Sequence, residues 1–210
     1  VKPLEVVGDC DPNRTGTTVT FKPDATIFDS EIYDYDTLKV RIRELAFLNK
    51  GLSISLRDDR DDEDTTGEHF LYEGGISEYV KFINQGKTPI HNDIIHLSGE
   101  EAGVFFEVAM QYNSSYNENI YSFVNNINTH DGGTHEEGVK RALTRVINNY
   151  ARKTNMLKEK DDALTGDDVK EGLTMIISCK HPNPQFEGQT KGRLGNSEVR
   201  KLADNVFSQG

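Results

Sequence analysis

The sequence has no long apolar run, only two cysteines, and fewer positive than negative charges. No apolar stretch approaches the roughly 20 residues that a membrane-spanning helix needs, so we expect no membrane partner. The two cysteines, Cys10 and Cys179, lie far apart and form no Cys-x-x-Cys or metal-binding spacing, which fits a reducing, cytoplasmic environment. A formal net charge of −11 argues against a surface that coats nucleic acid, although a local basic lining remains compatible with it.

Several catalytic signatures are also missing. There is no Walker P-loop and no Gly-x-Ser-x-Gly nucleophile elbow. Nor is there a pair of acidic residues in apolar sequence surroundings, which would suggest a general acid and base with shifted pKa values. The acidic run at 58–69 lacks the glycine that an EF-hand requires at its sixth position. The histidine pairs, His91 with His96 and His130 with His135, do not form a His-Glu-x-x-His zinc helix. We therefore predict no metal ligands in this chain.

Residues before about position 74 show strand and helix patterns in turn. Residues 16–22 alternate polar and apolar residues, which predicts a strand. Residues 37–51 place apolar side chains on one helical face and end at a glycine, which predicts a helix. Residues 52–58 and 68–72 then predict the two strands of a hairpin, with the acidic run at its tip.

A change in composition at 72–76 marks the predicted boundary between two domains, 1–74 and 75–210. Beyond it the patterns predict, in order, a helix at 76–86, strands at 104–112 and 119–127 that pair as a β-hairpin, a helix at 134–153, a short helix at 165–172, a strand at 173–180 and a helix at 196–207. This order predicts an α+β fold with helices on one face of a small sheet.

Two helix starts carry specific capping predictions. Thr134, followed three residues later by Glu137, predicts a capping box for the long helix. Asn196 predicts the N-cap of the last helix. The polar face of the long helix carries Arg141 and Arg145.

The stretch GQTKG, residues 188–192, is the best candidate for a binding site. Its two glycines let the backbone approach a ligand closely and adopt positive φ. Gln189 could donate an amide hydrogen bond and Lys191 could place a compact positive charge on a phosphate. A polar surface loop is the plainer interpretation, and spacing alone favours it. The Gly132–Gly133 pair before the long helix could also accept an anion, but turn geometry explains it better.

A resemblance to a known family covers nearly the whole chain. The motifs TGTTVTF, RIRELAFLNKG, YEGGI, KTPIH, FVNNINTHDGGTHEEGVKRALTRVIN, TGDDVKEGL and NPQFEGQTK followed by NSEVR occur in order. Together they resemble the ATPase region of the type IIA DNA topoisomerases, gyrase B in the first place and topoisomerase IV in the second. Another GHKL-type ATPase and an RNA-binding module like ribosomal protein S5 are more distant alternatives.

The resemblance implies a fold and a division of the chain. Residues 1–74 would be the C-terminal part of a GHKL-type ATP-binding domain. Residues 75–210 would be a transducer domain similar to the second domain of ribosomal protein S5, with a left-handed β-α-β crossover. The chain opens at Val1 without a signal peptide, and we expect it to be a fragment of a longer protein.

The resemblance also implies site residues, cofactors and partners. Gln189 and Lys191 would contact the γ-phosphate of ATP, with Lys191 as the catalytic residue. Thr17 would join the water network beside the adenine, and Arg141 and Arg145 are candidates for a DNA-lining surface. The implied partners are the gyrase A subunit, double-stranded DNA and a second copy of the parent protein.

The sequence departs from the family in one important respect. The Glu-Asn helix that supplies the general base and a magnesium ligand, and the glycine-rich lid, do not occur in it. ATP and Mg²⁺ would therefore be bound mainly by a part of the parent protein outside this chain. We expect the parent protein to be the enzyme and this fragment to be inactive alone.

Overall fold

The computed structural model describes residues 3, 5–13, 15–60 and 66–210. The chain divides into two units, residues 1–38 and 39–210, and each is described by itself. Helix α1 (Tyr35–Leu48) begins in the first unit and continues in the second.

The strand predicted at 16–22 is wrong. Val19 and Phe21 in this stretch are exposed, and none of the strands formed by the described residues pairs with it. A polar–apolar alternation becomes a strand only when a neighbouring strand supplies hydrogen bonds and a face to bury against.

The helix and the hairpin predicted before residue 74 are confirmed. Helix α1 buries its last three residues, Ala46 to Leu48. Strands β1 (Ile54–Asp58) and β2 (Thr66–Phe70) pair antiparallel, with Ile54 opposite Phe70. The predicted hairpin tip falls partly on residues 61–65, which lie outside the described residues.

The centre of the second unit is a five-stranded sheet in the order β3-β4-β7-β5-β6. Its strands are β3 (Ile95–Glu101), β4 (Val104–Tyr112), β5 (Asn119–Val124), β6 (Ile127–Asn128) and β7 (Leu173–Lys180). β4 pairs antiparallel with β3 and with β7, whereas β5 pairs parallel with β7.

The hairpin predicted between 104–112 and 119–127 is therefore wrong, because β7 lies between the two strands. Every residue of β7 except Lys180 is buried. A strand this apolar is most stable in the middle of a sheet with both faces covered. The polar turn after β4 resembles a hairpin turn, but the sequence around it carries no sign of the later strand.

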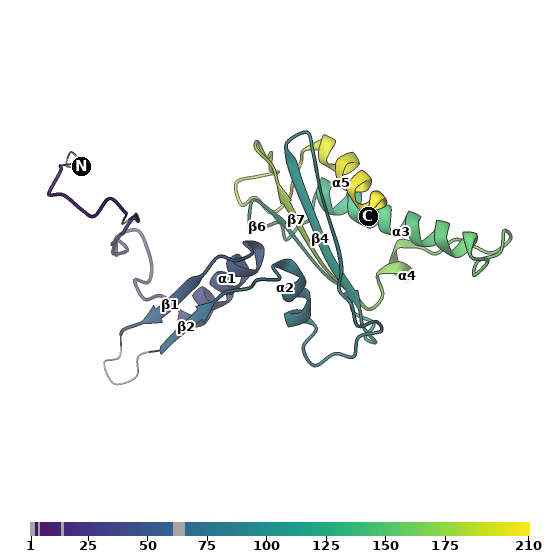
Figure 1. Ribbon diagram of the computed structural model, residues 1–210, viewed down its shortest axis with the longest axis horizontal. Coiled ribbons are helices and arrows are strands. Elements are labelled where there is room, and N and C mark those ends of the chain that lie inside the picture. The colour runs from purple at the N-terminus through teal and green to yellow at the C-terminus, as the bar shows by residue number, and fades with distance from the viewer. Residues whose placement is uncertain (1–2, 4, 14, 61–65) are drawn as a thin grey trace. The chain divides into compact units, whose positions relative to one another are not determined.

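The α+β class is confirmed, but the helices cover both faces of the sheet. α3 (Thr134–Lys153) and α5 (Ser197–Gln209) lie over one face, where Phe106 of β4 joins their core. α2 (Ile76–Ile83) lies on the other face, where Ala109 of β4 packs with it (Figure 1). The prediction of helices on one face thus holds for α3 and α5 and is wrong for α2.

The polypeptide between β5 and β7 contains α3, and the two strands are parallel neighbours, so they form a β-α-β crossover. The left hand of this crossover stays a prediction from the family resemblance.

The capping box predicted at Thr134 is wrong. The N-cap of α3 is Gly133, and the Oγ1 atom of Thr134 is buried without a hydrogen-bond partner among the described residues. The backbone N–H of Thr134 donates to the carbonyl of Leu194 instead (3.2 Å), because another segment of the chain crosses the helix start here. The Glu137 side chain is consequently free to pair elsewhere.

A capping box does form at the short helix α4 (Gly166–Lys170). The Asp168 N–H donates to the Thr165 hydroxyl oxygen at 3.2 Å, and the Thr165 N–H donates to the Asp168 carboxylate at 2.7 Å. Asn196 is the N-cap of α5 as predicted, but its side chain makes no capping bond. It accepts from the N–H of Gln185 at 2.6 Å, so it fixes the loop before the helix.

Candidate functional site

The candidate site is the loop of residues 185–195, which connects β7 to α5 and which we call the QTK loop. Its stem is a narrow hairpin in which the Gly195 N–H donates to the Gln185 carbonyl (2.8 Å) and the Glu187 N–H to the Arg193 carbonyl (2.9 Å). At the tip, the Lys191 N–H donates to the carbonyl of Gly188 at 3.3 Å. The loop thus presents a short tip on a paired stem.

Both predicted ligand-binding side chains lie at this tip. Gln189 and Lys191 are exposed, and neither side chain forms a hydrogen bond or ion pair with any other residue in the described part of the chain. The Lys191 ammonium lies 6.0 Å from the centroid of the Phe186 ring, at the outer limit of a cation–π contact. Lys191 also has φ +57°, a region that few non-glycine residues adopt. The tip therefore holds two donors ready for an external acceptor.

The stem of the QTK loop is fixed to the start of α3. The Leu194 N–H donates to the Gly132 carbonyl at 3.2 Å, and the Leu194 carbonyl accepts from Thr134. A Cβ atom on Gly133 would lie 2.5 Å from the Leu194 nitrogen, so only glycine permits this approach. Close backbone packing thus explains Gly133, whereas Gly132 has φ +73° and its N–H donates to the Thr129 carbonyl at 2.8 Å, the turn geometry that the sequence favours over an anion site.

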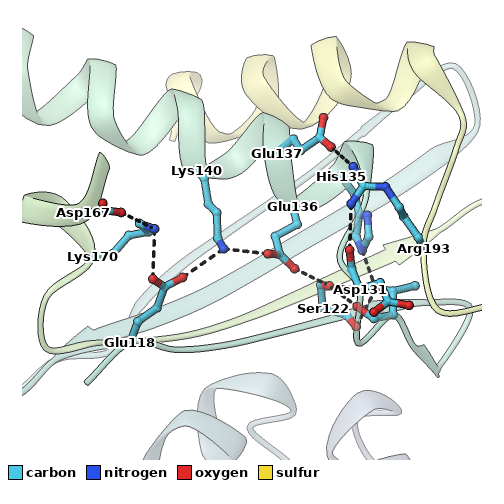
Figure 2. Close-up of polar contacts among 11 residues, drawn as sticks. Glu118, Ser122, Asp131, His135, Glu136, Glu137, Lys140, Asp167, Lys170 and Arg193 are labelled. Carbon is cyan, nitrogen blue, oxygen red and sulfur yellow. Dashed lines mark hydrogen bonds and ion pairs between the residues drawn. The ribbon is translucent and has the colours of Figure 1, made fainter. Parts of the chain in front are cut away.

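An ion-pair cluster adds to this attachment (Figure 2). The Arg193 guanidinium donates to the Asp131 carbonyl at 2.9 Å and to the Glu137 carboxylate. Arg200 of α5 donates to the other Glu137 oxygen at 2.9 and 2.7 Å. Glu137 thus joins α3, the loop and α5. Sequence reasoning missed this role, because no local pattern links residues that are more than fifty positions apart.

A chain of buried polar groups lies beneath the loop attachment (Figure 2). The Ser122 hydroxyl donates to Glu136 at 2.7 Å, and the Thr129 hydroxyl donates to the Ser122 carbonyl at 2.9 Å. The Thr129 hydroxyl oxygen is also hydrogen-bonded to Nε2 of His135, 3.0 Å away. Burial lowers the pKa of His135 to about 4, so this histidine is a neutral core residue.

The same chain continues along α3 through alternating charges (Figure 2). The Lys140 ammonium pairs with Glu136 at 2.8 Å and with Glu118 at 3.0 Å, and Lys170 pairs with Glu118 at 3.0 Å. Partial burial opposes ionisation of Glu118, but the hydrogen bonds from the two lysines outweigh it and lower its pKa. These pairs fix the start of α3 relative to β5 and α4.

The two predicted DNA-lining arginines have different surroundings. Arg145 forms a two-pronged ion pair with Asp204 of α5, at 2.8 and 2.6 Å. The Arg145 hydrogen bond is the main cause of the lowered pKa of Asp204, to which Arg141 contributes more weakly. The charge of Arg145 is thus largely neutralised, whereas Arg141 is exposed on the same helix.

Thr17, the predicted adenine-side residue, lies in the first unit. It lines a shallow pocket with its neighbours Cys10, Thr15, Gly16 and Thr18.

No helix of the described residues is long and apolar enough to cross a membrane.

Comparisons with known proteins agree on one family. A family model described as DNA gyrase B matches residues 75–210. The DNA gyrase B protein of Streptococcus pneumoniae serotype 4 is 57% identical over 100% of this chain, and the alignment covers 32% of that protein. The chain spans about a third of the length of such curated relatives.

Solved structures show the same likeness. The crystal structure of the 43K ATPase domain of Thermus thermophilus gyrase B, in complex with an aminocoumarin, matches 90% of this chain and 50% of that one, with a TM-score of 0.77 and 36% identity. The ATP-binding domain of Francisella tularensis topoisomerase IV matches 89% of this chain and 49% of that one, with a TM-score of 0.71 and 26% identity. The family model and the sequence identity together show that the chain belongs to the DNA gyrase B family.

Proposed function

We propose that this chain senses ATP and relays domain closure in the gyrase B protein of a DNA gyrase, a type IIA topoisomerase that hydrolyses ATP. Residues 1–74 complete an ATP-binding domain and residues 75–210 form the transducer. Gln189 and Lys191 contact the γ-phosphate of ATP, which is held with Mg²⁺ mainly by a part of the parent protein outside this chain. The observation that carries the proposal is the tip of the QTK loop, where two exposed donors stand on a stem fixed to α3.

The physical mechanism is differential affinity. Lys191 gains a charge-assisted hydrogen bond only when a third phosphate is present, so ATP favours the closed arrangement of the two domains and ADP does not. Such a bond contributes about 1.5–3 kcal/mol, which biases the equilibrium about 10- to 150-fold. Hydrolysis and phosphate release remove the contact, and the domains relax.

Other parts of the proposal follow from the family. The parent protein acts in the cytoplasm with the gyrase A subunit and double-stranded DNA, and it pairs with a second copy of itself when ATP binds. Arg141 and Arg145 contribute to a basic lining for DNA, and Thr17 contributes to the adenine side of the ATP site. Because Arg145 is already paired with Asp204, Arg141 is the stronger of the two DNA-lining candidates.

The test is Lys191→Ala in a full-length gyrase B protein that carries this sequence. We expect ATP turnover to be nearly abolished while ADP affinity stays close to normal, because ADP offers no γ-phosphate to the lysine. Lys153→Ala, which removes an exposed lysine from the far end of α3, is the matched control and should behave as wild type. Turnover at the wild-type rate in Lys191→Ala would refute the sensing role.

Topoisomerase IV is the second candidate, since a structure of its ATP-binding domain shares the fold. The 57% identity to a gyrase B protein favours gyrase. A supercoiling assay of the full-length protein together with gyrase A separates the two. Negative supercoiling of relaxed DNA is the expected result, and relaxation or decatenation alone would favour topoisomerase IV.

A further inference from the structure

Two adjacent asparagines form the turn between β5 and β6. Asn125 has φ +50° and Asn126 has φ +65°, and Val124 pairs with Ile127 on either side of them. A two-residue hairpin turn with both φ values positive favours asparagine and glycine. Turn geometry explains why these positions suit asparagine, but it leaves their side-chain contacts to be explained.

The side chain of Asn125 holds the segment that leads into the QTK loop. Its amide donates to the His181 carbonyl at 2.9 Å, and its oxygen accepts from the His181 N–H at 2.9 Å. Its own backbone N–H donates to the Cys179 carbonyl, also at 2.9 Å. Asn125 thus extends the hydrogen bonding of β7 beyond the end of the strand. His181 is buried, and the stem of the loop begins four residues later at Gln185.

The next residue, Asn126, is bound to Arg41 of helix α1 and to Asn49, which directly follows that helix. Its carbonyl accepts from the Arg41 guanidinium at 2.7 Å, and its side-chain amide donates to Asn49 at 3.2 Å. Arg41 is itself paired with Glu44, one turn further along α1. Both contacts join segments that are more than seventy residues apart in the sequence.

The geometry points to the Asn125–Asn126 turn as a positioning element that couples the QTK loop to helix α1. This inference rests on the proposed function, in which α1 belongs to the ATP-binding domain and the loop to the transducer. Hydrogen bonds weaken steeply as they lengthen or bend, so a shift of residues 181–185 would be passed through two covalently joined residues to Arg41 and Asn49. The apolar cluster around Leu48 also joins α1 to the sheet, but apolar contacts are not directional and do not fix a register in this way.

Glycine substitutions test this element without straining the turn, because glycine adopts positive φ freely. Asn125→Gly removes the two bonds to His181 and leaves the backbone able to keep its shape. Arg41→Met removes the donor to Asn126 and keeps the apolar stem. Asn155→Gly is the matched control, since Asn155 also has positive φ (+58°) but lies beyond the end of α3.

The measurement is the ratio of affinities for a non-hydrolysable ATP analogue and for ADP, in a full-length gyrase B protein that carries this sequence. We expect Asn125→Gly and Arg41→Met each to lower this ratio about two- to tenfold, as the loss of uncharged or singly charged hydrogen bonds does, with ADP affinity within about twofold of wild type. The double variant should be no worse than the more affected single variant, because both changes interrupt one connection. Asn155→Gly should leave the ratio unchanged.

An unchanged ratio in either single variant, or effects that multiply in the double variant, would overturn the inference. If Asn125→Gly does not fold, Asn125→Asp replaces it, since aspartate keeps the acceptor for the His181 N–H and loses the donor to its carbonyl. Lys191→Ala, measured alongside, separates this inference from the proposed function. Normal turnover in Lys191→Ala refutes the proposed function, whereas lost turnover there with a normal ratio in Asn125→Gly refutes only the coupling role.

Discussion

Replacing Gly133 by alanine should detach the QTK loop from α3 and lower the stability of the second unit. Gly133 has φ +137° and ψ −171°, a conformation that costs a residue with a side chain about 1–3 kcal/mol. The new Cβ would lie 2.5 Å from the nitrogen and 2.6 Å from the oxygen of Leu194, backbone atoms that cannot rotate away. The loop would have to move, which weakens two backbone hydrogen bonds of about 0.5–1.5 kcal/mol each.

These terms add up to a loss of about 2–6 kcal/mol, which for a unit of this size lowers the melting temperature by about 5–20 °C. Thermal unfolding followed by circular dichroism measures the shift. Gly86→Ala is the control, because Gly86 also has positive φ (+79°) but a Cβ there meets nothing within 4 Å. Gly86→Ala carries the backbone strain alone, so the difference between the two variants is the loss of the two hydrogen bonds, about 1–3 kcal/mol or about 2–10 °C. If the two variants melt within about 2 °C of each other, the close packing of Gly133 on Leu194 is not what holds the loop.

Two further predictions concern buried groups in the core of the second unit. Burial lowers the pKa of His135 to about 4, so its stabilising contribution is fully present above its unfolded pKa of 6.5, and the free energy of unfolding falls by about 3 kcal/mol as the pH drops from there to about 4. The melting temperatures at pH 7 and pH 5 should therefore differ less in His135→Leu than in the wild type. An equal difference in both proteins would contradict the neutral, buried state of His135. Cys179 is fully buried and burial raises the pKa of its thiol to about 12, whereas Cys10 is exposed. A thiol reagent at neutral pH should therefore modify Cys10 rapidly and Cys179 only after unfolding. Rapid modification of both cysteines would show that β7 opens readily.

Local periodicity predicted where the helices and strands of this fold lie more readily than it predicted which of them are neighbours in space. The apolar run of 173–180 and the 3.6-residue period of 134–153 identified β7 and α3, because burial on a defined face leaves a direct pattern in the sequence. β3 was missed, since an edge strand exposed on most of its residues leaves no alternation to find. The pairing of β5 with β7 also could not be predicted, because it depends on contacts about fifty residues apart.

The same holds for the candidate site, where the loop itself could be predicted from the sequence but its attachments could not. The glycines and the Gln189–Lys191 pair were visible as an exposed loop that could bind an anion, and only the family resemblance pointed to ATP as the proposed ligand. The attachments of the loop could not be predicted. Thr134 matches a capping-box pattern as well as Thr165 does, and only the passage of Leu194 over the start of α3 decides which threonine caps a helix. Glu137 was assigned to that cap and instead holds two arginines from other segments.

The order of strands in the sheet has a consequence for how the chain is made. During synthesis β4 and β5 leave the ribosome together, yet they meet only across β7, which follows after the whole of α3 and α4. Until residues 173–180 have emerged, each of the two earlier strands exposes an apolar edge that could pair with another chain. Nascent chains that stall before β7 should therefore depend on chaperones more strongly than chains that stall just after it.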